Sequence, residues 1–359
     1  MRIIHSLKDA LDFSGSYRDS SVENTLDYIF NHLHHNCYML KDSELVKFEH
    51  NSSPPSARKT LKNKLVKNAK TMRVMNCVIK QFNKTVTTST PYQNFISKLN
   101  LPKQICILNL TDALMLRKDR KEPWAILGDD LIPEKYRSQP FMKIYSGSGG
   151  IEYEDIPIPN YDDILIANGT DKIEDAELNW DQKEPIVIFR GSSTGCGIKP
   201  DTNMRLKIAK MTEPWLDAGI TKMTTQLKFD PKYGLGYIKS SDVKKASPKS
   251  FTEQSGYKYI VFIDGNVAAF RMLKWFMTGS LCLRVQSNFT LWYDDLIKDG
   301  KHYIAVKSDL SDLKEKYEWC LKHDKTCKKI AGNAYKFAQK YLTTPMISKV
   351  FLQKLSAKS

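Results

Sequence analysis

The sequence of 359 residues contains no long hydrophobic run. Its apolar stretches, such as residues 105–110 and 186–189, are far shorter than the roughly 20 residues that a membrane-spanning helix needs. Residues 1–12 interrupt their apolar pattern with charges at once, so they lack the uninterrupted hydrophobic core of a signal peptide. These absences predict a cytoplasmic protein without a transmembrane helix.

Cysteine is also scarce, with seven residues scattered along the chain. An odd and dispersed set does not form a disulfide framework, so free thiols in a reducing compartment are expected. Cys37 lies close to His32, His34 and His35, and these residue types can ligate a metal. No second cluster with ligand spacing follows, which disfavours a metal site there.

Acidic residues are few relative to basic ones, and the formal net charge is +15. Much of this charge falls on residues 58–73, where seven lysines and arginines gather without interleaved aromatic residues. The run matches no zinc-finger or RNA-recognition pattern. A solvated helix face is favoured, attraction to an anionic membrane surface or an acidic acceptor is the alternative, and a nucleic-acid partner is not expected.

The most informative stretch is residues 257–285, which predicts a strand, a tight turn, a helix and a second strand. Residues 259–263 are β-branched or aromatic, and Asp264-Gly265-Asn266 tolerates positive φ. A helix is expected to open at about Val267. Arg271 would then lie one turn inside it, where a cation is unfavourable unless an anion binds as well. A diphosphate site and an ordinary βαβ crossover with a solvent-facing arginine both fit these residues.

A glycine- and hydroxyl-rich loop, residues 190–197, follows the predicted strand 186–189. Such a loop can surround an anion with backbone N–H groups. It is not a Walker loop, because it does not end in Gly-Lys-Ser/Thr. A helix is expected at residues 203–209, and a further strand-forming segment at residues 215–221.

Another buried strand is predicted at residues 105–110, with Thr111 and Asp112 at its carboxyl end. Open α/β sheets bind ligands just outside the carboxyl ends of their strands, so Asp112 is a candidate functional carboxylate. On the local pattern alone, Asp112 can equally be the cap of the segment that follows.

These segments predict an α/β fold with two domains, since the chain exceeds the usual size of a single core. Residues 1–175 would form the first domain, residues 176–342 the second, and residues 343–359 a helix that crosses back to the first. Residues 1–50 are expected to be mostly helical, residues 57–82 to form a basic helix, and residues 168–184 to link the domains. A strand is also expected at residues 303–306, and helices are expected at residues 309–323 and 324–342.

The segments 189–194, 257–285 and 302–313 together resemble glycosyltransferase family 90, which includes capsule-associated xylosyltransferases and protein O-glucosyltransferases. The strong resemblance covers residues 186–342, and a weaker one reaches back to residue 105. It implies two Rossmann-like domains that face each other across a cleft, the GT-B arrangement. The sequence departs from the family at Thr111, where an arginine would be expected.

The resemblance implies an inverting transfer of glucose or xylose from a UDP-sugar to an acceptor hydroxyl on a glycan or protein. Asp112 would be the catalytic base. No cofactor is expected beyond the donor, and no metal, because the chain contains no Asp-x-Asp triplet. The donor-binding residues would be Arg190, Gly191, Ser192, Ser193, Thr194, Gly265, Asn266, Val267, Ala268, Ala269 and Arg271.

Two rival classes remain open from the sequence. A protein that kept this fold but lost catalysis would still bind a UDP-sugar, and calorimetry without turnover would identify it. A basic nucleic-acid-binding protein would instead show a steep salt dependence of its affinity.

Overall fold

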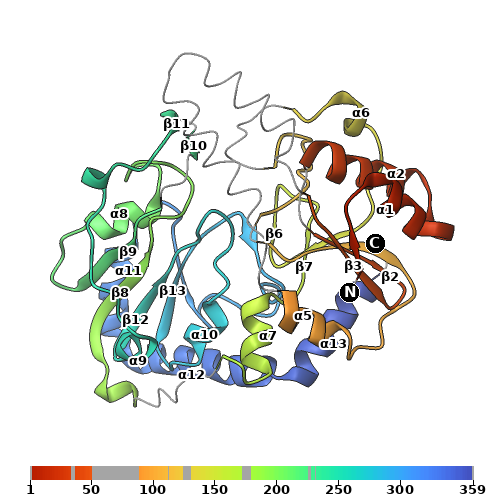
Figure 1. Cartoon of the computed structure of the whole chain (residues 1–359). Helices are drawn as coiled ribbons and strands as arrows, with labels where there is room; N and C mark the ends of the chain where they lie inside the picture. Colours follow the sequence, from red (N-terminus) through yellow and green to blue (C-terminus); the bar gives the residue numbers. More distant parts are fainter. Residues whose placement is uncertain are drawn as a thin grey trace. The chain divides into compact units, whose positions relative to one another are not determined.

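The computed structural model describes residues 2–33, 37–50, 89–111, 113–123, 131–171, 179–224, 228–230 and 232–357. The chain divides into two compact units, coloured along the sequence in Figure 1. The first unit comprises Met1–Ile158, Gln226–Phe229 and Leu352–Ser359, and the second Pro159–Thr225 and Asp230–Phe351. Both units combine helices with a sheet that contains parallel strands, which confirms the predicted α/β class.

The first unit contains a mixed sheet in the order β1-β3-β2-β4-β5-β7. Strand β2 is antiparallel to both of its neighbours, whereas β4, β5 and β7 run parallel. The predicted strand at residues 105–110 is β4, near the middle of this sheet. The strands are β1 (Ile3–Ile4), β2 (Tyr38–Lys41), β3 (Glu44–Phe48), β4 (Ile105–Asn109), β5 (Ile144–Ser146) and β7 (Ile156–Pro157).

The expectation that residues 1–50 are mostly helical is only partly right. Helices α1 (Leu7–Ser14) and α2 (Ser20–Asp27) and a π-helical turn (Tyr28–Leu33) are present. The remainder is the hairpin β2–β3, which turns at Asp42 with a φ of 52°. Strand β2 also pairs with β4, more than 60 residues later, and this distant pairing overrides the weak local pattern.

The remaining helices of the first unit are α5 (Ser89–Ile96) and α6 (Glu134–Arg137). Its core joins α1, α2 and the π-helical turn to β2, β3 and β4 through side chains such as Leu26, Ile29, Met39, Val46 and Ile107. The predicted basic helix at residues 57–82 lies outside the described residues, as do His34 and His35.

The second unit is built on a parallel sheet in the order β15-β13-β12-β8-β9. Its strands are β8 (Glu184–Ser192), β9 (Leu216–Lys222), β12 (Tyr257–Phe262), β13 (Leu281–Val285) and β15 (Ile304–Val306). Each coincides with a strand-forming segment of the sequence. Such near-continuous apolar runs are typical of parallel strands that are buried on both faces.

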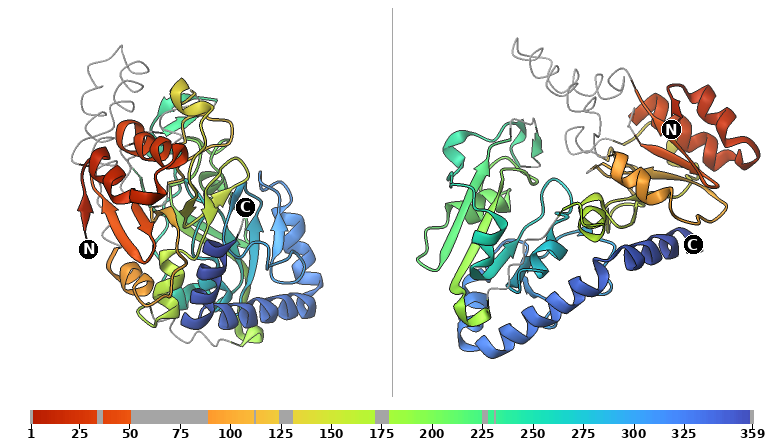
Figure 2. Two further views of the ribbon diagram at one scale, coloured as in Figure 1. Left: turned by 90° about the vertical axis from the view of Figure 1, so that its right-hand side faces the viewer. Right: turned by 60° about the horizontal axis from the view of Figure 1, so that its bottom comes forward.

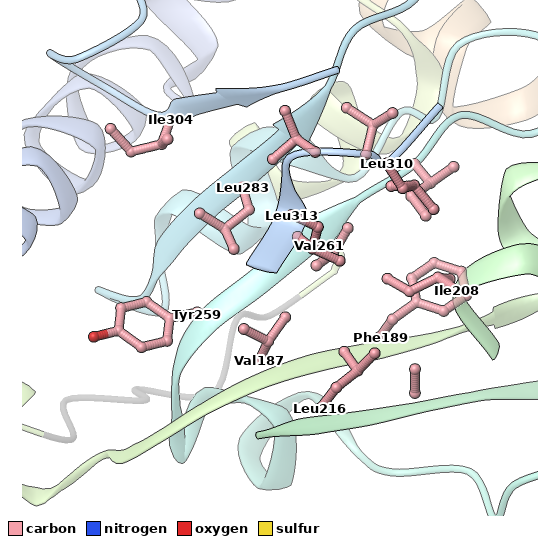
Figure 3. Packing of buried hydrophobic residues seen from close by; sticks show 14 of the residues in the cluster. Val187, Phe189, Ile208, Leu216, Tyr259, Val261, Leu283, Ile304, Leu310 and Leu313 are labelled. Atoms are coloured by element: carbon pink, nitrogen blue, oxygen red, sulfur yellow. The ribbon is translucent and has the colours of Figure 1, made fainter. Parts of the chain in front are cut away.

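One face of this sheet packs against helices α8 (Met204–Lys210) and α11 (Leu313–Lys322). Figure 3 shows Val187, Phe189, Val261 and Leu283 on the strands and Ile208 and Leu313 on the helices, all directed into one core. Helix α10 (Met272–Phe276) contacts β13 and helix α12.

Further helices of the second unit are α7 (Tyr161–Ala167), α9 (Phe251–Ser255) and α12 (Asp324–Tyr341). Figure 2 shows α12 in blue. Helix α13 (Thr344–Ser356) begins in the second unit, and its last residues belong to the first. In the described ranges, no helix is both long and apolar enough to cross a bilayer. Short strands outside the two larger sheets are β6 (Gly149–Gly150), β10 (Lys228–Asp230), β11 (Gly234–Gly236) and β14 (Phe289–Thr290).

The edge strand β9 is covered along part of its length by the segment around Lys244, Lys245 and Ala246. Ile220 exchanges backbone hydrogen bonds with Lys244 and Ala246. Gly219 allows this approach, because a Cβ atom at that position would lie only 2.2 Å from the Cβ of Ala246.

Candidate functional site

The strand order of the second unit defines where a ligand is expected to bind. From β8 the chain passes to β9 on one side and then returns to β12 on the other side, so the order reverses between β8 and β12. Ligands of open α/β sheets bind at such a switch point, outside the carboxyl ends of the strands. Two of the predicted segments, residues 190–197 and 264–271, follow these two strands.

Arg205 joins the two loops. Its Nε donates to the carbonyl oxygen of Asp264 at 2.9 Å, its Nη2 to that of Ile263 at 2.8 Å, and its Nη1 to Thr194 Oγ1 at 2.7 Å. A further bond runs between the loops themselves, from Gly195 N to Asn266 Oδ1 at 3.0 Å. The loops that follow β8 and β12 are therefore held together by the buried side chain of Arg205 and by the hydrogen bond from Gly195 N to the Asn266 side chain.

Two glycines lie beside this arginine. A Cβ atom at Gly265 would lie 3.3 Å from Thr194 Oγ1 and 3.6 Å from Arg205 Nη2, and one at Gly191 would lie 3.6 Å from Arg205 Nη1 but only 3.0 Å from the ring of Phe189. The distances to the guanidinium are ordinary van der Waals contacts, so the tighter limits come from Thr194 and Phe189. Asn203 is the N-cap of α8, and its Oδ1 accepts hydrogen bonds from Arg205 N and Leu206 N, which fixes the start of the helix that carries Arg205.

Arg271 lies close enough to Arg205 for the two charges to repel. Burial lowers the pKa of Arg205 to about 10, repulsion from Arg271 adds to this shift, and attraction to Asp264 opposes it. Arg271 remains accessible to solvent, yet the surrounding protein lowers its pKa as well, against attraction to Asp162. Both arginines stay cationic at neutral pH.

Neither guanidinium forms an ion pair with a carboxylate of the described residues. Arg205 donates to carbonyl and hydroxyl oxygens, and Arg271 makes no side-chain hydrogen bond there. A buried charge without an ion-pair partner is costly, and this applies to Arg205. Together with the exposed Arg271 beside it, this charge favours binding of an anion with several oxygen atoms at the switch point, such as a diphosphate.

The predicted helix start at Val267 is wrong. Residues 264–270 form a loop, and Arg271 is the N-cap of α10 rather than a residue one turn inside it. Gly265 N donates to Val267 O, and Asp264 Oδ1 accepts the hydrogen bond of Ala269 N at 2.7 Å. The aspartate side chain therefore takes a backbone donor that a helix would leave free. Ala268 is buried in this loop.

The side chain of Arg190 is engaged with other partners. Its Nη2 pairs with Asp217 at 2.6 Å, and its other nitrogens donate to carbonyl oxygens of Phe189, Asp217 and Ser247. Ser192 Oγ is 3.1 Å from Thr194 Oγ1. The buried Ser193 accepts a hydrogen bond from Thr224 N, which ties the loop to the end of β9.

Asp112, the predicted base, lies outside the described residues. Just before it, Thr111 donates to Asn109 Oδ1 from both its backbone nitrogen and its hydroxyl. The nearby carboxylate Asp155 is fully buried and accepts hydrogen bonds from Ser146 Oγ, Met115 N and Leu116 N. Burial raises the pKa of Asp155 to about 6, although these donors oppose the shift.

Sequence reasoning missed Arg205, although a signal was present. Arg205 is the second residue of helix α8, the first α-helix after the glycine-rich loop. The positive end of a helix disfavours a cation there, and the same argument had singled out Arg271. Applied to every predicted helix start, it would have found Arg205.

The sequence contains three pairs of adjacent aspartates, at residues 129–130, 162–163 and 294–295. In the described residues these pairs do not form a shared carboxylate site. Asp163 is buried in α7 and accepts a hydrogen bond from Trp292 Nε1 at 2.7 Å, and burial raises its pKa to about 8. Asp294 pairs with Arg284 at 2.9 Å. The pair at 129–130 lies outside the described residues, and within these no three His, Cys, Asp or Glu residues gather as a metal site would require.

The sequence model of glycosyl transferase family 90 matches residues 149–357, more than half of the chain. The chain belongs to this family. The match includes both loops of the switch point. It also includes Arg205 and Arg271, so the candidate site is part of the segment that defines the family.

Relatives of this family 90 chain occur in viruses and animals. Uncharacterized protein 035R of Invertebrate iridescent virus 3 is 33% identical over 66% of this chain and 23% of its own length. Protein O-glucosyltransferase 3 of Mus musculus is 28% identical over 72% of this chain and 52% of its own length. The chain thus spans about a quarter and about half of these relatives. Among solved structures, Anabaena Alr3699/HepE in complex with UDP-glucose aligns over 48% of each chain with 12% identity and a TM-score of 0.33.

Proposed function

We propose that this protein transfers glucose or xylose from a UDP-sugar to a hydroxyl group of a glycan or protein, with inversion at the anomeric carbon. The observation that carries the proposal is the pair of guanidiniums, Arg205 and Arg271, that lack a carboxylate ion-pair partner at the switch point between β8 and β12. Membership of family 90 and similarity to a protein O-glucosyltransferase support the choice of a sugar donor.

In the proposed reaction the acceptor oxygen attacks the anomeric carbon from the face opposite the diphosphate. The bond between that carbon and the diphosphate oxygen breaks, and its electron pair leaves with UDP. Arg205 and Arg271 stabilise the negative charge that develops on the leaving group. Because Arg205 is already fixed by three strong hydrogen bonds, little reorganisation is needed as the charge appears.

The proton of the acceptor hydroxyl passes to the carboxylate of Asp112 in this proposal. The resemblance to the family supports that role, and so does the position of the residue just after strand β4. Near the end of this strand, Asp155 accepts hydrogen bonds from two backbone nitrogens and a serine hydroxyl, and Glu154 forms an ion pair with Arg120. Both of these carboxylates are already bound by structural partners.

The test is a donor screen with UDP-glucose, UDP-xylose, UDP-galactose and UDP-N-acetylglucosamine, in which both release of UDP and transfer to added glycan acceptors are measured. We expect UDP release from UDP-glucose or UDP-xylose, and calorimetric binding of UDP alone. Binding of UDP without turnover of any donor would identify a catalytically inactive UDP-sugar-binding protein. Absence of UDP binding would overturn the proposal.

A further inference from the structure

The second unit carries a surface pocket of about 350 Å³ that includes none of the predicted donor-binding residues. One wall is a single face of helix α12, and the other is the segment that precedes strand β15. The pocket is open to solvent, and its size suits a small ligand. Its lining residues are Leu296, Lys301, His302, Asn333, Lys336, Phe337, Lys340 and Tyr341.

The pocket is strongly cationic. Lys301, Lys336 and Lys340 are exposed, and in the described part of the chain their ammonium groups form no ion pair or hydrogen bond. No acidic residue lines the pocket. Lys336 and Lys340 lie four residues apart on α12, where like charges repel and destabilise a helix. An anion between them would remove that repulsion.

His302 lines the pocket beside Lys301. Its Nδ1 accepts a hydrogen bond from Lys298 N at 3.0 Å, so the ring proton is on Nε2. Burial lowers the pKa of His302, and the neighbouring Lys301 lowers it further. The imidazole is therefore neutral at physiological pH and can still donate from Nε2.

The floor of the pocket is aromatic and firmly packed. Phe337 and Tyr341 stack with their ring centroids 4.3 Å apart, and Trp292 packs against Tyr341 at 6.2 Å. Lys340 Nζ lies 5.3 Å from the centroid of the Tyr341 ring. Asn333 Nδ2 donates to Lys301 O at 3.1 Å, which fixes the loop wall against the helix wall.

We propose that this pocket binds a phosphomonoester, with the phosphate between Lys301, Lys336 and Lys340 and the organic part against Leu296 and the aromatic floor. Three lysines suit a phosphate dianion, because lysine binds phosphate as a point charge and the dianion carries more negative charge than a carboxylate does. The phosphate can belong to a soluble sugar phosphate or to a phospholipid headgroup.

The experiment compares two double variants of the same helix. Lys336→Gln/Lys340→Gln removes two charges from the pocket, whereas Lys325→Gln/Lys329→Gln removes two exposed charges at the same spacing but outside the pocket. Both lower the net charge equally. The probes are glucose 6-phosphate, measured by calorimetry with excess UDP present, and phosphatidylcholine vesicles with or without phosphatidic acid, measured by sedimentation.

We expect the pocket variant to bind about tenfold more weakly than the native protein, because each lost ammonium removes a charge-assisted contact. The control variant should stay within about twofold, since distant exposed charges are screened by salt. Binding of glucose 6-phosphate assigns a soluble ligand, and binding only of vesicles that contain phosphatidic acid assigns a headgroup. Equal losses in both variants, or no binding of either probe, would overturn the proposal.

Discussion

The two units organise their charged side chains in different ways. In the second unit, Arg205 bridges two loops and keeps its charge without a carboxylate partner, and Arg271 lies beside it. In the first unit, the described carboxylates near β5 and β7 have structural partners, as Asp155 and Glu154 show. The second unit thus has positive charge that no carboxylate of the described residues pairs with, whereas the carboxylates of Asp155 and Glu154 in the first unit are engaged in the fold.

The largest expected effect separates the two units directly. Asp112→Asn keeps the shape of the side chain but removes its affinity for a proton, so turnover should fall by about 10² to 10⁴-fold. The affinity for UDP should not change, because the proposed nucleotide contacts belong to the second unit. Initial rates and calorimetry with UDP measure the two quantities. An unchanged rate would mean that Asp112 is only a cap, since asparagine caps a helix equally well.

The next effect concerns the second unit alone. Arg271→Ala removes a guanidinium that makes no side-chain hydrogen bond in the described residues, so the fold should persist while the affinity for UDP falls roughly 100-fold. Arg190→Ala is the matched control. It should lower stability, because it removes the ion-pair partner of Asp217, and change UDP affinity by no more than about threefold. Equal losses of affinity would show that Arg190 contacts the donor, as the family resemblance implies.

A third effect compares the buried carboxylates of the two units. Burial raises the pKa of Asp155 to about 6 and that of Asp163 to about 8, whereas an unfolded aspartate titrates near 3.8. The folded state thus binds these protons more tightly, so the free energy of unfolding should decrease as the pH rises from about 4. The contribution of Asp155 should end near pH 6, and that of Asp163 near pH 8.

Urea unfolding between pH 6 and 8 therefore tests the contribution of Asp163, which lies in the second unit. Asp163→Asn should flatten the pH dependence in this interval, whereas Asp295→Asn, an exposed aspartate of the same unit, should leave it unchanged. A slope that persists in Asp163→Asn would assign the titration to another group.

The smallest expected effect is that of a chelator. Two guanidiniums can stabilise a departing diphosphate in place of a divalent ion, so we predict that EDTA leaves the transfer rate unchanged. Loss of activity that Mn²⁺ restores would contradict this prediction, and would mean that the second unit supplies too little positive charge by itself.

The sequence predicted the second unit better than the first, for physical reasons. Parallel strands buried on both faces, such as β8 and β12, are continuous apolar runs that are visible without knowledge of their neighbours. The hairpin β2–β3 depends on pairing with β4, which no local pattern reports. At the site, the residue types of both loops predicted their positions. The conformation of the backbone after β12 was predicted wrongly as a helix start, because the sequence does not reveal that the Asp264 side chain accepts the hydrogen bond of Ala269 N.

The segment around Lys244 to Ala246, which covers part of the edge of β9, bears on the solubility of the protein. An uncovered edge strand offers free backbone groups to any other chain and promotes aggregation. Here Lys244 and Ala246 occupy part of that edge, and two lysines add charge that repels a second copy. Since Gly219 alone leaves space for Ala246, a larger residue at position 219 would push the segment away. The damage would appear as insoluble protein rather than as lost affinity for a ligand.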